Sequence, residues 1–161
     1  MEHSEFAESY RRWYRPMLLY AYALTREWSS AEDLVQSAFM KALLSYQGGE
    51  ERLRAWLMRV LRNEFVSRRR KDTRLAGQDE LERQGGGDPL EQVLKREEQR
   101  RVYGAVLALP EKYREALLQS VVAGLSDGEI ARLWDTTEEN VRKIRSRARE
   151  KLRKQLEEGE A

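Results

Sequence analysis

The segment Leu125–Lys154 reads LSDGEIARLWDTTEENVRKIRSRAREKLRK. Ser126 and Glu129 have the spacing of a capping box, which predicts that a short helix begins here. Asp135 stands where the turn between two such helices usually has glycine, and Asp tolerates the left-handed backbone better than most residues. The next helix repeats apolar residues every three or four positions, at Val141, Ile144, Ala148 and Leu152. This spacing predicts a helix-turn-helix unit.

The second helix of this unit has the charge pattern of a helix that reads DNA. Either Thr136 or Thr137 is expected to cap it, and Thr136 with Glu139 repeats the capping-box spacing. Residues 142–154 then carry eight basic side chains and one acidic side chain. Such a helix places polar groups on base edges and basic groups on phosphates, although a basic helix packed in a bundle is the alternative. The expected DNA contacts are Asn140, Arg142, Lys143, Arg145, Ser146, Arg149 and Arg153.

The composition of the whole chain excludes several classes of protein. Its 161 residues include no Cys and a single His, His3. A disulfide framework, a thiol redox centre and a Cys-based zinc site are therefore excluded, and little is left for His-based catalysis. Apolar runs are too short to span a membrane, and the N-terminus lacks the apolar core of a signal peptide. We expect a cytoplasmic chain without membrane insertion, metal or cofactor.

Charge is segregated along the chain, although the net charge is only +2. Residues 54–74 carry eight basic and two acidic side chains, whereas residues 75–99 carry three basic and seven acidic ones. Together with residues 142–154, this makes two basic blocks separated by an acidic stretch. A solvated helix face is the alternative for either block alone, but two blocks of similar size favour a nucleic-acid partner.

The rest of the chain has helical periodicity and no alternating strand pattern. Helices are expected over residues 6–26, 31–46, 51–70 and 90–107, with further helix up to a stop at Gly124. Pro16 predicts a kink or break in the first helix. Ser29 and Ser30 precede Glu32 and Asp33 with the spacing of two capping boxes. We therefore expect an all-α chain with a domain at 1–72, a flexible acidic linker at 73–89 and a domain at 90–161.

Several short motifs lie at suggestive spacings in these helices. They are Ala31-Glu32-Asp33-Leu34-Val35-Gln36, Trp56-Leu57 followed by Arg62-Asn63, Leu109-Pro110 with Arg114-Glu115, Glu129-Ile130-Ala131 and Arg147-Ala148-Arg149. In this order, the chain resembles the extracytoplasmic-function (ECF) sigma factors, minimal members of the bacterial sigma-70 family. The resemblance covers residues 5–71 as sigma domain 2 and residues 90–156 as sigma domain 4.

The resemblance implies that the helix at residues 31–46 docks on the clamp coiled coil of the beta-prime subunit of core RNA polymerase. The residues at matching positions are Glu32, Asp33, Gln36, Phe39 and Lys41. A mixed acidic and apolar helix face suits a helical, Arg-bearing partner. For Glu32 and Asp33, helix capping alone is the alternative. Sigma domain 4 would meet the beta flap of the same polymerase and the minus-thirty-five element.

The resemblance also implies that the third helix reads and melts the minus-ten promoter element. Asn63 matches the position that holds a base flipped out of the non-template strand, and its amide offers both a donor and an acceptor. Phosphate contacts are expected from Arg59, Arg62, Arg68, Arg69, Arg70 and Lys71. Trp56 could stack on a base, but its spacing favours the core. Ser67 departs from the Asp or Asn that is common in the family, and the loop Gln47–Arg52 receives no role.

The implied function is a promoter-specificity subunit of RNA polymerase, without catalysis of its own and commonly held by an anti-sigma factor. The acidic stretch Asp79–Glu98 would thread toward the RNA exit path, unless it is an ordinary solvated linker. A free-standing helix-turn-helix regulator is one alternative, and it leaves residues 31–71 unexplained. An RNA-binding adaptor that uses both basic blocks is a second alternative, but such a protein would not need the helix-turn-helix periodicity that this sequence has. A nucleic-acid-processing enzyme usually needs an acidic metal-ligand cluster, and none is apparent in the sequence.

Overall fold

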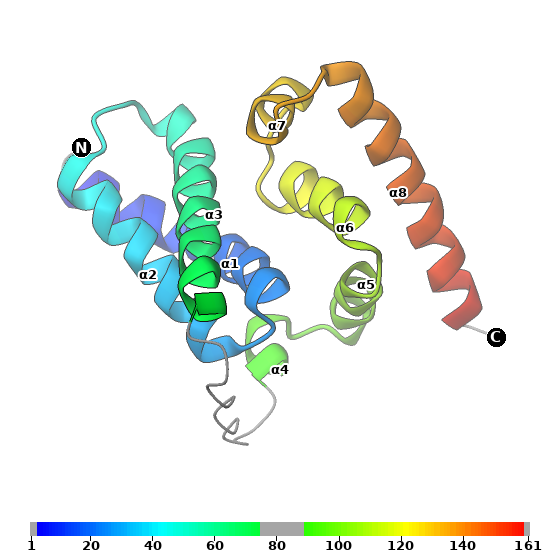
Figure 1. The fold of residues 1–161 in the computed structure, drawn as a ribbon. Coiled ribbons are helices and arrows are strands. Elements are labelled where there is room, and N and C mark those ends of the chain that lie inside the picture. The colour runs from blue at the N-terminus through cyan, green and yellow to red at the C-terminus, as the bar shows by residue number, and fades with distance from the viewer. Residues whose placement is uncertain (1–2, 75–88, 160–161) are drawn as a thin grey trace. The chain divides into compact units, whose positions relative to one another are not determined.

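The computed structural model describes residues 3–74 and 89–159, which contain helices and no strand (Figure 1). The chain divides into two compact units. The first contains α1 (His3–Thr25), α2 (Trp28–Ser45) and α3 (Glu50–Arg74). The second contains α4 (Pro89–Val93), α5 (Glu97–Leu107), α6 (Glu111–Leu117), the π-helical turn η1 (Leu118–Val122), α7 (Asp127–Trp134) and α8 (Glu138–Gly159). The expected all-α class is confirmed, and most of the expected linker lies outside the described residues.

The three helices of the first unit enclose one apolar core. α1 packs along α2, and both helices pack on α3. α1 contributes the unbroken buried run of residues 17–21, and the other two helices contribute buried residues at helical spacing. From α2 and α3 these are Leu34, Val35, Ala38, Phe39, Leu53, Leu57, Met58 and Leu61. Burying one Leu side chain completely stabilises the fold by roughly 1.5–3 kcal/mol. The buried residues of α2 and α3 together therefore hold the basic helix α3 in place.

Pro16 lies inside α1 and does not break it, because α1 continues to Thr25. Proline removes one backbone hydrogen bond and costs a helix about 3 kcal/mol. The turns that follow Pro16 are the most deeply buried part of α1, with Met17, Tyr20 and Ala21 inaccessible to solvent. Their burial outweighs the local penalty, and the expected break is therefore not found.

The start of α2 differs from the sequence-based expectation. The helix begins at Trp28, and its N-cap residue Glu27 makes no side-chain capping bond. Ser29 and Ser30 lie within the first turn, where the Ser30 hydroxyl donates to the Glu27 carboxylate. The two expected capping boxes are therefore wrong. The helix starts earlier because the Trp28 ring stacks on Tyr22 of α1, with ring centroids 4.0 Å apart.

The loop between α2 and α3 is closed by Tyr46. Its hydroxyl donates to the carbonyl of Gly49 at 2.5 Å, and its backbone N–H donates to Ala42. The Tyr46 ring also lies 5.1 Å from the ring of Trp56. Trp56 is thus partly buried against this loop, as its spacing indicated. The short loop has a structural function, which is to join the end of α2 to the first turns of α3.

The second unit begins with two helices where the sequence predicted one. α4 ends at Val93, α5 begins at Glu97, and Leu94 turns into the core between them. The carbonyl of Leu94 accepts a hydrogen bond from the Arg100 guanidinium at 2.7 Å. This side-chain bond replaces a helical backbone bond. The break therefore depends on a residue six positions away, which periodicity alone does not reveal.

α6 leads into a π-helical turn that the sequence did not predict. In η1 the N–H of Ala123 donates to the carbonyl of Leu118, five residues back, at 3.0 Å. Gln119, which the turn carries, is completely buried. Gly124 then takes a left-handed backbone with φ 70°, which confirms the expected stop. The wider turn and the glycine redirect the chain toward α7.

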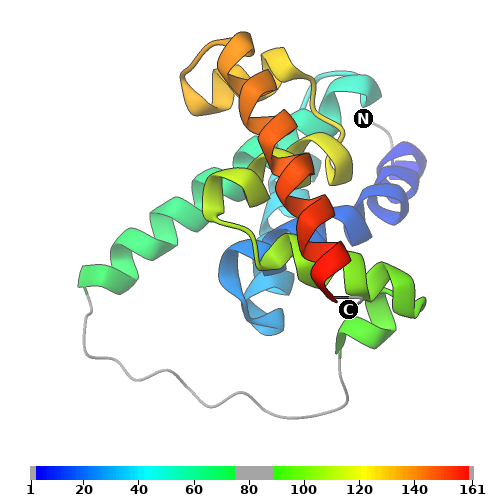
Figure 2. The same ribbon diagram turned by 90° about the vertical axis from the view of Figure 1, so that its right-hand side faces the viewer.

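α7 and α8 form the predicted helix-turn-helix. The Ser126 hydroxyl accepts from Glu129 N–H and the Glu129 carboxylate accepts from Ser126 N–H, so the predicted capping box is present. Asp135 has φ 57° and ψ 54°, the left-handed conformation that this turn needs. Val141 and Ala148 of α8 are fully buried, and α8 packs on both α6 and α7. Figure 2 shows α8 as one unbroken helix.

Candidate nucleic-acid interface

The first turn of α8 is capped by Thr137, one of the two expected caps. The Thr137 hydroxyl accepts a hydrogen bond from the Asn140 backbone N–H at 3.1 Å. The Asn140 side chain donates to the Thr136 hydroxyl at 3.1 Å, and Asn140 remains exposed. Thr136 therefore holds a side chain and does not form the expected second capping box with Glu139. This network fixes the orientation of the first exposed polar group on the helix.

The residues of α8 that were expected to contact DNA fall into an open set and a tethered set. The open set is exposed and consists of Asn140, Arg142, Lys143, Ser146 and Arg149. Arg145 differs, because its guanidinium lies 2.8 Å from the Asp127 carboxylate at the start of α7 and only 23% of its side chain is exposed. Arg142 is a more distant partner of the same carboxylate, at 4.0 Å. Arg145 thus braces the two helices against each other and does not stand on the open face.

Arg153 is also tethered, within α8 itself. Its guanidinium is paired with Glu150 on one side and with Glu157 on the other. All three side chains are about half exposed. Two carboxylates offset the charge that the sequence assigned to a phosphate. Arg142 and Lys143 of the open set lie in the first half of α8, which is the half that enters the major groove in helix-turn-helix proteins, and Arg149 follows in the second half.

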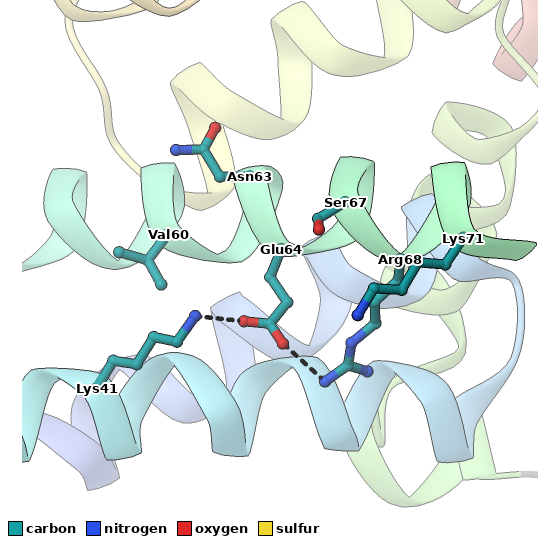
Figure 3. A pocket seen from close by; sticks show the side chains of 7 residues that line it. All are labelled: Lys41, Val60, Asn63, Glu64, Ser67, Arg68 and Lys71. Carbon is teal, nitrogen blue, oxygen red and sulfur yellow. Dashed lines mark hydrogen bonds and ion pairs between the residues drawn. The ribbon is translucent and has the colours of Figure 1, made fainter.

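Asn63 lies at the exposed rim of a groove in the first unit. The groove has a volume of about 410 Å³ and lies along α3, with Lys41 of α2 on its other side (Figure 3). Val60 supplies an apolar surface, and the Asn63 amide points away from α2 in Figure 3. The remaining lining residues are Glu64, Ser67, Arg68 and Lys71. An amide beside an apolar surface and several cations is an arrangement that suits an unpaired nucleotide.

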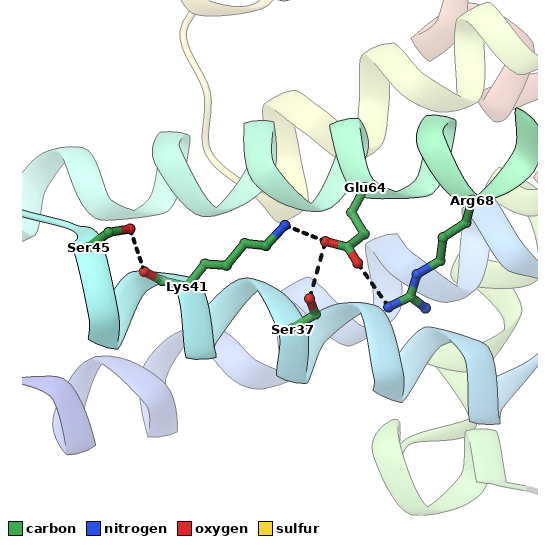
Figure 4. Close-up of polar contacts among 5 residues, drawn as sticks. All are labelled: Ser37, Lys41, Ser45, Glu64 and Arg68. Carbon is green, nitrogen blue, oxygen red and sulfur yellow. Dashed lines mark hydrogen bonds and ion pairs between the residues drawn. The ribbon is translucent and has the colours of Figure 1, made fainter. Parts of the chain in front are cut away.

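Glu64 was missed by the sequence analysis and is the centre of a polar cluster (Figure 4). Its carboxylate accepts from Lys41 Nζ at 2.7 Å, from the Ser37 hydroxyl at 3.2 Å and from Arg68 at 3.0 Å. Only 18% of the Glu64 side chain is exposed. The bond from Lys41 lowers the pKa of Glu64, partial burial raises it, and the bond from Arg68 lowers it again, so that the net pKa falls below its usual value. An acidic residue inside a basic helix was the available signal.

The other basic residues of α3 differ in exposure. Arg59, Arg69, Arg70 and Lys71 are exposed, whereas Arg62 is partly buried. The Arg69 guanidinium lies 5.8 Å from the ring of Phe65, on its own helix. The structure thus keeps four of the six expected phosphate-contacting side chains on the surface, and it ties a fifth, Arg68, to Glu64.

The outer face of α2 carries three of the five residues expected to contact polymerase, and a fourth, Lys41, is exposed but lines the α3 groove, where it is bound to Glu64. Glu32, Asp33 and Gln36 are exposed, and the Gln36 amide donates to the Tyr10 hydroxyl at 2.9 Å. Phe39 does not belong to this surface, because it is 2% exposed and its ring centroid lies 4.8 Å from that of Tyr10. The expectation of a surface role for Phe39 is therefore corrected to a role in the core.

The same face of α2 continues into an apolar patch that the sequence analysis did not include. Leu44 is 76% exposed, and Met40 and Leu43 are also exposed. With Asp33 and Gln36, the residues Met40 and Leu44 follow a three- and four-residue spacing and so share one side of the helix. Exposed apolar residues at this spacing are typical of a surface that binds another protein.

Other kinds of site are not found in the described part of the chain. Residues 3–74 and 89–159 contain no group of three His, Cys, Asp or Glu side chains that could hold a metal ion. None of the described helices is long and apolar enough to cross a membrane.

Comparison with known proteins defines the family. Residues 9–75 match the family model for Sigma-70 region 2, and residues 99–152 match the model for Sigma-70 region 4. The chain belongs to the sigma-70 family of RNA polymerase sigma factors, and within it to the ECF group. Its function is that of a sigma factor, which recognises promoters and initiates transcription.

Individual relatives agree with this assignment. The chain is 27% identical to the ECF RNA polymerase sigma factor SigM of Bacillus subtilis, over 91% of each chain. It is 26% identical to the RNA polymerase sigma factor YlaC of the same organism, over 97% of this chain and 95% of YlaC. The sigma factor RpoE of Bartonella quintana, solved with the anti-sigma factor NepR, has the same fold with a TM-score of 0.65, 23% identity and coverage of 95% of this chain and 97% of RpoE.

Proposed function

We propose that this sigma factor divides promoter recognition between its two basic helices and binds core polymerase through α2. The observation that carries the proposal is that polar and cationic side chains are exposed at two places, on α8 from Asn140 to Arg149 and around the α3 groove. Each helix is held by a separate apolar core. The chain supplies no catalysis in this assignment, and the chemistry of RNA synthesis belongs to the polymerase.

In this proposal α8 reads the minus-thirty-five element. The Thr137 cap and the Thr136 bond orient Asn140 at the start of the helix, where side chains reach base edges. Arg142 and Lys143 follow at the same end and are exposed. Exposed Arg149, two turns further, is placed to contact a phosphate and to fix the register of the helix. Asp127 and Arg145 set the angle between α7 and α8 from behind.

The α3 groove captures the minus-ten element as single-stranded DNA. The Asn63 amide offers a donor and an acceptor to a flipped base, while Val60 offers an apolar surface to the base plane. Exposed Arg69, Arg70 and Lys71 lie along the same helix, where they follow the backbone of the opened strand. A capture site for one base and a cationic path for the next phosphates together favour melting, because they bind the strand only when it is unpaired.

Core polymerase binds to the outer face of α2. This face has two halves, an acidic one with Glu32 and Asp33 and an apolar one with Met40 and Leu44. A helical partner with Arg beside apolar residues complements both halves, and the beta-prime clamp coiled coil is the partner that the family resemblance implies. The second unit would bind the beta flap. We further propose a cytoplasmic location and an anti-sigma factor that covers one of these surfaces when the sigma factor is inactive.

The test is reconstituted transcription with the purified chain, core polymerase and a promoter library. Promoter-specific transcripts are expected, and the sequenced transcripts give the minus-thirty-five and minus-ten elements. Reversal of both charges in a Glu32→Lys, Asp33→Lys variant should reduce co-elution with core polymerase. If the chain binds duplex DNA but yields no transcript, the division of labour proposed here is wrong and a free-standing regulator is favoured.

A further inference from the structure

The groove beside Asn63 has an acidic residue among its cations. Glu64 follows Asn63 directly in α3, and its carboxylate points toward α2, whereas the Asn63 amide points away (Figure 3). The carboxylate is mostly buried and accepts three hydrogen bonds, from Ser37, Lys41 and Arg68 (Figure 4). A carboxylate in a groove that binds a polyanion repels the ligand. Its presence there therefore needs an explanation in terms of another effect on binding.

Glu64 holds two of the three cations that line the groove. Lys41 reaches across from α2, and Arg68 reaches back by one turn along α3. Both side chains remain about half exposed, at 54% and 41%. Without Glu64, each of them would be free to turn toward a DNA phosphate. With Glu64 present, their charge is offset inside the groove, and Lys71 is the cation of the groove lining without a carboxylate partner in Figure 3.

We propose that Glu64 is a positioning residue that keeps Lys41 and Arg68 off the DNA backbone, so that the groove takes up a base and not a phosphate. A phosphate inside the groove would face the Glu64 carboxylate at close range, which is repulsive. A neutral base is not repelled. The backbone is therefore directed to Lys71 and the exposed arginines at the end of α3, and the base is directed to Asn63 and Val60. This inference rests on the proposed role of the groove in minus-ten capture.

Apolar packing of α2 on α3 does not require this cluster. Leu53, Leu57 and Leu61 already hold the two helices together, and all three are fully buried. Exposed ion pairs add only about 0–1 kcal/mol to stability, so a Lys41–Glu64 pair would be a weak device for that purpose. The cluster instead acts on the distribution of charge around Asn63.

The experiment measures how the full chain binds two fluorescein-labelled 20-nucleotide probes by fluorescence anisotropy at several salt concentrations. One probe is single-stranded DNA of mixed sequence, and the other has the same backbone with abasic sites throughout. Wild type is compared with Glu64→Gln and with Glu50→Gln. The second variant is a matched control, because it removes an exposed carboxylate that is also ion-paired on α3, with Arg12 at 2.6 Å.

Glu64→Gln should bind the abasic probe several-fold more tightly than wild type, and its preference for the probe with bases should fall. Each freed cation that gains a phosphate steepens the slope of log K against log salt by about 0.7 on single strands, so the slope should steepen by up to about 1.4. Glu50→Gln should leave both the preference and the slope close to wild type. Circular dichroism checks that all variants have the same helical content.

Two results would overturn the inference. The first is a Glu64→Gln variant whose slope and base preference equal those of wild type. The second is an equal change in Glu50→Gln, which would show a general effect of net charge. If wild type itself does not prefer the probe with bases, then the assignment of the groove to base capture fails, and the inference fails with it. Transcription in the reconstituted assay would then still support the family function.

Discussion

The two basic helices α3 and α8 carry similar charge but present it differently. On α8 the open cations begin in the first two turns, next to a capped N-terminus, and the helix is held by Val141 and Ala148. On α3 the polar centre, Asn63, lies in the second half of the helix, with exposed Arg59 before it and exposed Arg69, Arg70 and Lys71 after it. A helix that enters a groove end-on needs its contacts at one end, whereas a helix that lies along an opened strand needs them along its side.

At both α3 and α8, some of the nearby cations are paired with a carboxylate of the protein itself. Glu64 holds Lys41 and Arg68, and Asp127 holds Arg145. The difference lies in where the carboxylate stands. Asp127 lies between two helices and braces them, while Glu64 lines the groove itself. A count of basic residues therefore overestimates the cationic surface, because some of the positive charge is paired with carboxylates of the protein itself.

The largest expected effects test whether the two units have independent cores. Leu57→Ala and Ile130→Ala each remove a fully buried side chain, one from each unit, and should lower the free energy of unfolding of that unit by about 2–5 kcal/mol. Leu44→Ala is the control, because Leu44 is exposed and the change should stay within about 0.5 kcal/mol. Urea unfolding, followed by circular dichroism, measures the free energy of unfolding of each variant. A single shared transition in all variants would contradict independent cores.

Removing a cation from α8 should weaken DNA binding more when that cation is exposed and unpaired than when it is held by a carboxylate. Arg142→Ala and Arg149→Ala should each weaken binding to minus-thirty-five DNA by about 1–3 kcal/mol, because both side chains are exposed. Arg153→Ala should have a smaller effect, because Glu150 and Glu157 already pair with Arg153. Mobility-shift titrations of the holoenzyme measure this order. Equal losses in all three variants would show that the tethered arginine is available to DNA after all.

Substitutions in α3 should affect a later step of initiation, the formation of the open complex. Asn63→Ala removes a contact to an unpaired base, and a good base contact is worth about 1–3 kcal/mol. Open-complex formation should therefore fall about tenfold, while closed-complex binding should change little. Permanganate footprinting reports the melted bases and a mobility shift reports the closed complex. Normal melting in Asn63→Ala would remove the central residue of the α3 assignment.

A smaller change in stability should distinguish the capping box at Ser126, which forms, from the one expected at Ser29, which does not. Ser126→Ala should lower the free energy of unfolding of the second unit by about 1 kcal/mol, because it deletes the capping bond to Glu129. Ser29→Ala should have less than half of this effect, because Ser29 lies inside the first turn of α2 and α2 has no side-chain cap. Thermal unfolding of both variants provides the comparison. A larger loss for Ser29→Ala would indicate a cap that the structure does not contain.

The smallest effect is the pH dependence of Glu64. Its pKa is lowered in the folded chain, chiefly by the bond from Lys41, so it stabilises the first unit above the ordinary carboxyl pKa of 4.5. This contribution is lost as the pH falls below 4.5 and through the lower pKa of the folded state. The stability difference between wild type and Glu64→Gln should therefore shrink in that window. A difference that stays constant with pH would mean that the carboxylate charge does not matter for stability.

Features that depend on near neighbours in the chain could be predicted from the sequence. The capping box at Ser126, the left-handed Asp135 and the stop at Gly124 each involve residues within a few positions. The periodicity also indicated α1, α2, α3 and α8, and the motifs indicated the family. These features are local, because helix periodicity and capping are set over three or four residues.

The partners of individual side chains came from the packing of one helix on another. Lys41 and Glu64 are 23 residues apart, and Asp127 and Arg145 are 18 apart, so no local spacing brings either pair together. Nor could the sequence distinguish the cap at Thr137 from its neighbour Thr136, because both lie at the start of α8. Phe39, by contrast, shares the three- and four-residue spacing of the buried stripe of α2, so its burial follows from periodicity, and only the family resemblance placed it on the surface. Arg68 and Arg153 are held by carboxylates three or four positions away on their own helices, a spacing that the sequence contains. Whether Lys41 and Arg145 are held or left open is decided only when the helices pack, because the carboxylate then comes from another helix.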